Sequence, residues 1–244
     1  MLSQRLQPHR IQLILEKCTD IRLQAISRVK EKNYRHEFLV LRSLSEKNQL
    51  HFHHSGRPAL VLGHCAPGID LPFVNFDLEG AIRHAIRHFS RLGRQQIYFL
   101  INEGAAYGLH RLRDAFVTAC QSWPHRPISG KIVCIPREPA AQFHELHRFS
   151  SSLQKMDGVL VMAPVNFAAV ITTFLRYRGD IFPEIEMISV GSAADPPVSW
   201  PPAMRYYIML EPAIKAITHA AVHFFETGFL PKLSKIIPLE ISNA

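Results

Sequence analysis

The chain has 244 residues and a mass of 27.8 kDa, enough for one large domain or for two lobes that each bury their own core. Hydrophobic residues make up 47% of the chain and charged residues 20%, which excludes a disordered, fibrous or small disulfide-stapled protein. The formal net charge is +8, and residues 1–57 alone hold 11 basic against 5 acidic side chains. This basic end predicts a phosphate-rich partner nearby, although a solvated basic face without a partner explains the charge equally well.

The sequence predicts neither a membrane span nor a leader peptide. The longest apolar stretch, residues 203–225, is interrupted by Arg205, Glu211 and Lys215. The first ten residues lack the apolar core of a signal peptide, so we expect the protein in the cytoplasm. Four cysteines stand far apart, without any CxxC pair, and are predicted to be buried thiols: Cys18, Cys65, Cys120 and Cys134.

Short apolar runs alternate with amphipathic segments along the chain. The runs are continuous rather than alternating in polarity, which is typical of strands buried on both faces. Strands are expected at residues 11–15, 38–41, 59–62, 97–101, 132–135, 158–162, 187–190 and 205–209. Helices are expected at residues 20–32, 77–92, 109–120, 138–153, 165–178 and 212–227. This order predicts an α/β fold with parallel sheets that are covered by helices.

The chain lacks the short motifs that would indicate catalysis. It has no GxxxxGK[ST] loop, no GxGxxG after a strand and no GxSxG elbow, so we expect neither an enzyme nor a bound cofactor. The 14 histidines include two pairs at helical spacing and a cluster in a segment that resembles a loop: His84 and His88, His219 and His223, and His51, His53 and His54. No HExxH motif and no third ligand accompany them, so no metal site is predicted.

The predicted helix at residues 165–178 is apolar around nearly its whole circumference. Such a helix is either wholly internal or shared between a core and a second chain. In a two-layer α/β lobe the outer helix faces solvent, so we expect a homodimer contact there. The residues expected to form this contact are Phe167, Val170, Ile171 and Phe174.

Three segments, in order, resemble motifs of one protein family. Residues 74–100 (VNFDLEGAIRHAIRHFSRLGRQQIYFL) are similar to a V-x-x-D-N-x-x-G-A … H-L-x-x-x-G-H-x-x-I pattern. Residues 109–119 (LHRLRDAFVTA) are similar to an R-x-x-G-F-x-x-A helix, and residues 157–191 are similar to an N-D-x-x-A … G-x-x-V-P-x-x-x-S-V-I-G run. Through these segments the chain resembles the effector-binding domain of the LacI/GalR family of bacterial transcription regulators, which is itself similar to periplasmic sugar-binding proteins.

The resemblance implies two parallel-sheet α/β lobes joined by crossover strands, with a small-molecule cleft between them and a dimer along both. By this analogy the N-terminal lobe comprises residues 1–74 and 211–230, and the C-terminal lobe comprises residues 76–208 and 231–244. Only about 43 residues separate the expected strands at 11–15 and 59–62, which leaves room for one strand where the family fits two. The first lobe is therefore expected to be trimmed.

Several positions that bind the effector in the family carry other residues here. The effector-binding arginine falls on Leu112, the Asn of the N-D pair on Pro164, the aspartate after I-G near Ala193, and the aspartate of the first hinge on Phe76. These losses argue against a typical sugar effector. Strand and helix ends place six residues as candidate ligand contacts instead: Asp77, Tyr107, Arg111, Arg113, Asn166 and Asp195.

The resemblance implies an effector-sensing and dimerising domain of a transcription regulator. The helix-turn-helix headpiece of the family is not in this sequence, so operator DNA is expected to meet a module outside it. The alternatives are a solute-binding protein of the same fold, which the missing signal peptide disfavours, and a small α/β enzyme, which the missing acid, base and nucleophile motifs disfavour. A regulator that has lost its small-molecule ligand is a further alternative.

Overall fold

The computed structural model describes residues 1–12, 37–42, 44–122, 128–192 and 203–242, and the chain divides into two compact units. The first unit comprises Met1–Phe76, Ala105–Gly108 and Leu210–Pro238, and the second comprises Asp77–Gly104, Leu109–Met209 and Leu239–Ala244. In the described part, no helix is both long and apolar enough to span a bilayer. The expected strand at residues 11–15 and helix at 20–32 lie largely or wholly outside the described residues.

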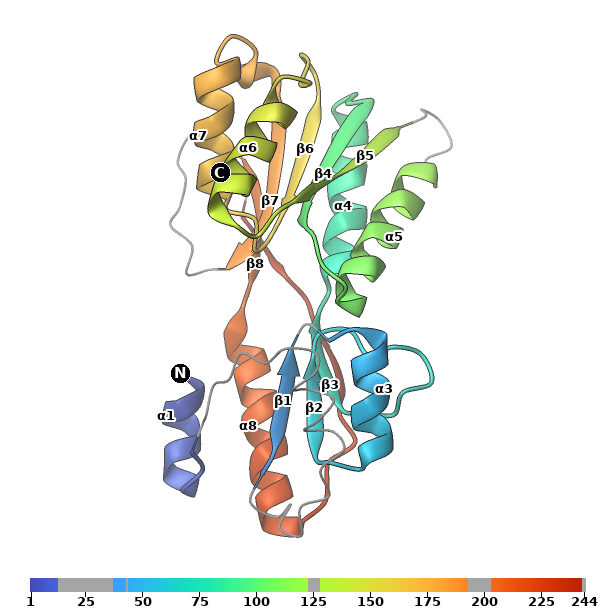
Figure 1. The fold of residues 1–244 in the computed structure, drawn as a ribbon, viewed down its shortest axis with the longest axis vertical. Coiled ribbons are helices and arrows are strands. Elements are labelled where there is room, and N and C mark those ends of the chain that lie inside the picture. The colour runs from blue at the N-terminus through green and yellow to red at the C-terminus, as the bar shows by residue number, and fades with distance from the viewer. Residues whose placement is uncertain (13–36, 43, 123–127, 193–202, 243–244) are drawn as a thin grey trace. The chain divides into compact units, whose positions relative to one another are not determined.

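The first unit is built on a four-stranded parallel sheet with a helix on each face (Figure 1). The strands run in the order β1 (Leu39–Arg42), β2 (Ala59–Leu62), β3 (Phe73–Phe76) and β9 (Ser234–Ile237). Alternate residues of β2 serve the two faces: Val61 packs in the cluster that holds Phe52 of α3 (Glu46–Ser55), and Leu60 packs against α8 (Leu210–Thr227). The short helix α1 (Leu2–Leu6) also packs on α8, where Leu6 is buried and Arg5 pairs with Glu211.

The second unit is built on a six-stranded sheet in the order β10-β8-β7-β6-β4-β5. All neighbouring pairs are parallel except β10 with β8. The strands are β4 (Gln96–Asn102), β5 (Ser129–Ile135), β6 (Gly158–Met162), β7 (Glu186–Ser192), β8 (Met204–Ile208) and β10 (Glu240–Ser242). One face carries α4 (Leu78–Arg91) and α5 (Tyr107–Gln121), and the other carries α6 (Pro139–Ser150) and α7 (Phe167–Arg178) (Figure 1).

Apolar side chains of β4 alternate between the two cores of this unit. Phe99 and Ile101 pack with α4 and α5, whereas Leu100 packs with α6 and α7, and all three are fully buried. Gly130 lets α5 approach β5 closely, because a Cβ there would lie 2.7 Å from Sγ of Cys120 and 2.9 Å from the ring of Phe116. The continuous apolar runs of the sequence thus become strands that are covered on both sides, as expected.

Three elements differ from the sequence expectations. The segment with His51, His53 and His54 is not a loop but part of α3, which begins at the cap Ser45 and ends at the left-handed Gly56 (φ 65°). The strand β3 was not expected. The final segment divides, because β9 pairs with β3 of the first unit and only Leu239–Ala244 belongs to the second, whereas residues 231–244 were all expected in the second.

The side chains expected to contact a second copy are mostly core residues of the chain itself. Val170 and Phe174 are 0% exposed and Ile171 is 5% exposed, and all three belong to the core beneath α6 and α7. Phe167 is only partly buried, beneath the guanidinium of Arg205, whose Cζ lies 5.0 Å from the ring centroid. Other residues form the outward face of α7. Any contact that this helix makes with a second copy would therefore involve those residues rather than the predicted ones.

Two phenylalanines at opposite extremes of exposure test this packing. Replacing the fully buried Phe174 by alanine should lower the free energy of unfolding by about 3–5 kcal/mol, because it leaves a cavity in the core. The same change at Phe229, which is 75% exposed, should lower it by less than about 1 kcal/mol. Urea denaturation followed by circular dichroism measures both values, and equal losses would contradict the core described here.

Candidate ligand-binding site

The carboxyl edge of the six-stranded sheet is where this fold presents a site. Apart from β10 the strands are parallel in the order β5-β4-β6-β7-β8, so their carboxyl ends share one edge. The helix that follows β4 lies on one face of the sheet and the helix that follows β6 lies on the other. In open parallel sheets, ligands bind where neighbouring strands send their connections to opposite faces. The residues just beyond β4 and β6 are therefore the candidate site.

Two side chains near the end of β4 each have a polar atom without a hydrogen-bond partner among the described residues. Asn102, the last residue of β4, is 2% exposed; its Nδ2 donates to the carbonyl of Ile135 at 3.0 Å, while its Oδ1 has no hydrogen-bond partner among the described residues. Arg113, in the second turn of α5, places Nη2 3.4 Å from the carbonyl oxygen of Asn102, and its buried Nε has no described partner either. Buried polar atoms without partners are rare in folded proteins and indicate a place that water or a ligand completes.

Asp77 and Arg111 belong to an exposed charge network of α4 and α5. Asp77 caps α4 by accepting a hydrogen bond from the Gly80 amide at 2.9 Å. Arg111 donates to both carboxylate oxygens of Glu79 at 2.9–3.2 Å, and Arg83 lies within 4.0 Å of Asp77 and 3.8 Å of Glu79. Both expected ligand residues thus already have partners within the chain.

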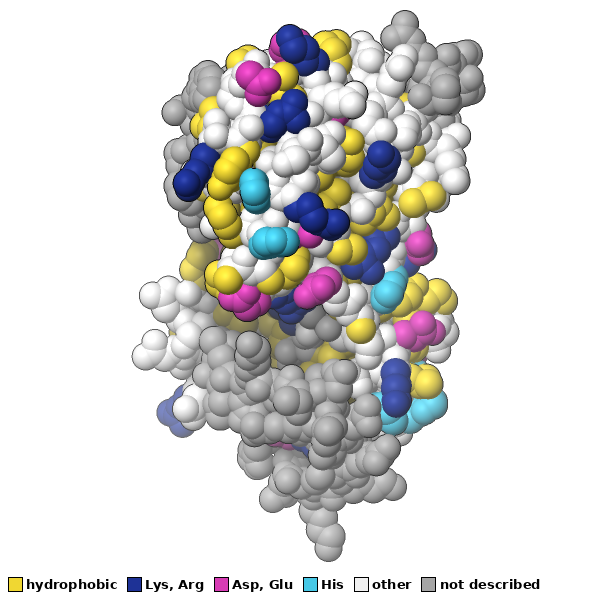
Figure 2. Space-filling view, turned by 45° about the horizontal axis from the view of Figure 1, so that its top comes forward, with side chains coloured by type: hydrophobic (Ala, Val, Ile, Leu, Met, Phe, Trp, Pro, Cys, Tyr) yellow, Lys and Arg dark blue, Asp and Glu magenta, His cyan; other side chains and the backbone are white. Residues whose placement is uncertain are grey.

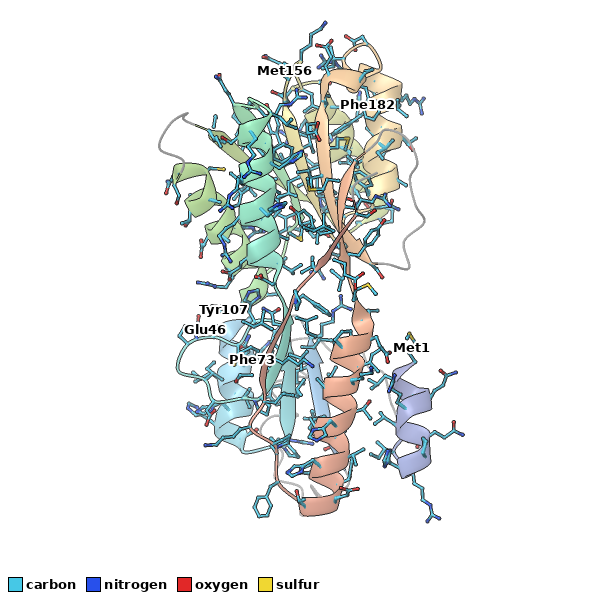
Figure 3. All side chains as sticks on the ribbon, turned by 180° about the vertical axis from the view of Figure 1, so that it is seen from behind. Met1, Glu46, Phe73, Tyr107, Met156 and Phe182 are labelled. Carbon is cyan, nitrogen blue, oxygen red and sulfur yellow. The ribbon has the colours of Figure 1, made fainter. Side chains whose placement is uncertain are left out.

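The other candidates lie at separate places. Asn166 follows β6 and caps α7, where its Oδ1 accepts a hydrogen bond from the amide of Ala169 at 3.1 Å. Tyr107 belongs to the first unit, where its amide donates to the carbonyl of Leu44 at 2.9 Å, and Figure 3 shows it beside Glu46 at the start of α3. Asp195 lies outside the described residues. Of the six candidates, Arg113 and Asn166 lie just beyond the two strands where the connections diverge.

The cysteines do not share one environment. Burial raises the pKa of the Cys120 thiol to about 11, so this residue remains a neutral core thiol as expected. Cys134 contradicts the expectation, because β5 is an edge strand and leaves this side chain exposed, with Sγ 3.7 Å from Nη2 of Arg113. Cys65 is half-buried and donates to the carbonyl of Ile69, and Cys18 lies outside the described residues.

No cluster of metal-ligating side chains lies at this edge among the described residues. Within the ranges that the structure describes, no three His, Cys, Asp or Glu side chains gather closely enough to hold a metal ion. Glu138, the nearest acidic residue before α6, accepts hydrogen bonds from the amides of Ala140 and Ala141, which lower the pKa of its carboxyl. The edge presents the guanidinium of Arg113, the amide side chains of Asn102 and Asn166, and the main-chain groups at the strand ends. Together these groups can bind a polar molecule.

Comparison with known proteins identifies the fold. No family model and no curated protein matches the sequence. Solved structures do match: a dimeric Lac repressor with a C-terminal deletion is 13% identical with a TM-score of 0.77, over 99% of this chain and 90% of that chain. The probable maltose operon transcriptional repressor of Staphylococcus aureus is 13% identical with a TM-score of 0.73, over 100% of this chain and 87% of that chain.

A third similar structure is a LacI family transcriptional regulator from Enterococcus faecium with bound ribose, 14% identical with a TM-score of 0.72 over 99% of this chain and 89% of that chain. The chain therefore has the fold of the LacI-type, periplasmic-binding-protein-like regulators along its whole length. This confirms the fold class that the sequence predicted. The sequence reasoning missed Asn102, although a polar residue that ends an apolar run (IYFLIN) was the available signal.

The pair of Arg111 and Glu79 should behave as a surface ion pair. A double-mutant cycle with Arg111→Ala and Glu79→Ala should give a coupling energy of about 0.3–1 kcal/mol, because both side chains are partly exposed and hydrated. Thermal or urea unfolding of the four proteins measures it. A coupling energy above about 2 kcal/mol would instead show a desolvated structural pair.

Proposed function

We propose that this chain is the effector-sensing and dimerising part of a bacterial transcription regulator that works in the cytoplasm. The observation that carries the proposal is the match in fold to repressors over 99% of this chain and 90% of a dimeric Lac repressor. The similar structures are named as repressors or regulators, one bound to operator and an anti-inducer and others holding ribose or D-xylulofuranose. A solute-binding protein of the same fold is the second candidate, and no catalytic constellation in the described residues favours an enzyme.

The effector would bind at the carboxyl edge of the six-stranded sheet, beside Arg113 and Asn166. A ligand changes the activity of such a protein only if it binds one conformation more tightly than another. Hydrogen-bonding groups without a partner among the described residues, such as Nε of Arg113 and Oδ1 of Asn102, supply such a difference. Operator DNA would be contacted by a helix-turn-helix module outside these 244 residues, close to the basic end of the chain.

The size of the native polypeptide and its binding to genomic sites test the proposed function directly. We expect an antibody against this domain to detect, in the cells that make it, a polypeptide larger by about sixty residues, the size of a three-helix DNA-binding module. Chromatin immunoprecipitation with the same antibody should recover a small set of genomic sites, with occupancy that changes with growth conditions. If the antibody recovered all genomic regions equally, or recovered none, the result would contradict a role in transcription regulation and favour the solute-binding alternative.

A second copy of the chain would pack on the outward face of α6 and α7. These helices lie side by side on one face of the sheet, and Phe143 (48% exposed) and Leu175 (38% exposed) point away from the core. The rings of His147 and Tyr177 are tilted at 41° with centroids 4.1 Å apart, and His144 of the same helix is exposed. Figure 2 shows hydrophobic and histidine side chains next to one another on the upper part of the molecule. A mixed apolar and aromatic face of this kind suits a protein contact.

Charged substitutions on this face should separate the copies. Phe143→Glu and Leu175→Glu should each give a monomer in sedimentation velocity, because a carboxylate would be desolvated in the contact, while the circular dichroism spectrum stays unchanged. Phe229→Glu is the matched control, since Phe229 is 75% exposed and belongs to the first unit, whereas α6 and α7 belong to the second. A dimer that survives both test variants would place the contact elsewhere.

A further inference from the structure

The carboxyl end of β4 carries positive charge that no described carboxylate neutralises. Among the described residues, Arg113 has no carboxylate within 4.0 Å; its Nη2 has only long contacts, to the carbonyl oxygen of Asn102 at 3.4 Å and to Sγ of Cys134 at 3.7 Å. A second guanidinium comes near the same strand end, because a Cβ on Gly104 would lie 3.4 Å from Nη2 of Arg137. Arg137 also forms no ion pair with a described residue. The guanidinium groups of Arg113 and Arg137 therefore both lie close to the main chain at the end of β4, at Asn102 and Gly104 respectively.

Acidic side chains near this edge are engaged elsewhere or face solvent. Glu138 follows Arg137 directly, but its two carboxylate oxygens accept hydrogen bonds from the first amides of α6. Glu103 follows Asn102, is exposed, and forms no ion pair with a described residue. The contrast with Arg111 is direct: two residues away on the same helix, that guanidinium is held by Glu79 at 2.9–3.2 Å.

We infer that the ligand of this edge carries a negative charge, as a carboxylate or a phosphate ester, and that Arg113 binds it. The inference rests on the proposed function, because it specifies the ligand of the same site. A partly buried cation without a counter-charge is unfavourable, and an oxyanion satisfies a guanidinium through two parallel hydrogen bonds. A neutral polyol would leave the charge of Arg113 uncompensated.

Cys134 provides a local reporter of occupancy. Its thiol is exposed and lies 3.7 Å from Nη2 of Arg113, so an anion on that guanidinium would hinder attack on a maleimide. The rate of alkylation by N-ethylmaleimide would be measured residue by residue with peptide mass spectrometry. Half-buried Cys65, in the first unit, is the internal reference for effects of salt on thiol reactivity.

The probes are inorganic phosphate, acetate and neutral ribose, each compared with sodium chloride at equal ionic strength. A probe at twice its Kd should slow alkylation of Cys134 by about threefold, because only the unbound fraction reacts. We expect this slowing with phosphate or acetate and not with ribose, and no slowing at Cys65. Which anion protects distinguishes a phosphate ester from a carboxylate as the natural group.

Matched variants decide whether Arg113 is responsible. Protection should disappear in Arg113→Gln and persist in Arg111→Gln, because only the first removes a guanidinium without a counter-charge, and both should keep the wild-type circular dichroism spectrum. Protection that persists in Arg113→Gln, or is absent for both anions, would overturn the inference. If only ribose protected Cys134, and only when Arg113 was present, the result would contradict a negatively charged ligand. It would still support a ligand site at this edge. The chromatin immunoprecipitation experiment tests independently whether the protein is a transcription regulator.

Discussion

The position of β4 within the second unit determines both its core and its candidate site. This strand is hydrogen-bonded to β5 on one side and β6 on the other, and Ile97, Phe99, Leu100 and Ile101 are all 0% exposed. Because the chain leaves β4 toward one face and β6 toward the other, the strand that anchors both cores also ends where the connections diverge. Burial of β4 therefore fixes the strand end that holds Asn102, beside which α5 places the guanidinium of Arg113.

Much of this fold could be predicted because buried parallel strands have a simple signature. Runs such as residues 97–101 and 158–162 are apolar at every position, and each became a strand. The helix α3 lacked such a signal: its sequence EKNQLHFHHS has few apolar residues, and it is stabilised instead by the Ser45 cap and by buried polar residues. Gln49, for example, bonds the carbonyl of His64 and the amide of Ala66. Tertiary hydrogen bonds of this kind leave no periodic trace in a sequence.

The candidate site was harder to predict, because partners decide what a side chain is free to do. Arg111 and Arg113 are equivalent by position in the sequence, yet only the structure shows that Glu79 holds the first. The apolar helix predicted at residues 165–178 presented a similar ambiguity, since a sequence cannot show which apolar side chains face the chain's own sheet. Val170 and Phe174 face that sheet, which leaves the proposed contact with a second copy to residues such as Leu175.

The absence of a side chain at Gly130 has a consequence for how ligand affinity could change over evolution. Phe116 and Cys120 of α5 pack against this glycine, so any larger residue would push the helix away from β5. Arg113 is carried by the same helix, one turn before Phe116. A side chain at position 130 could therefore displace the guanidinium by a fraction of an ångström and change binding at the proposed site without replacing Arg113 or Asn102. The spacing between α5 and β5 would thus influence ligand affinity at the proposed site.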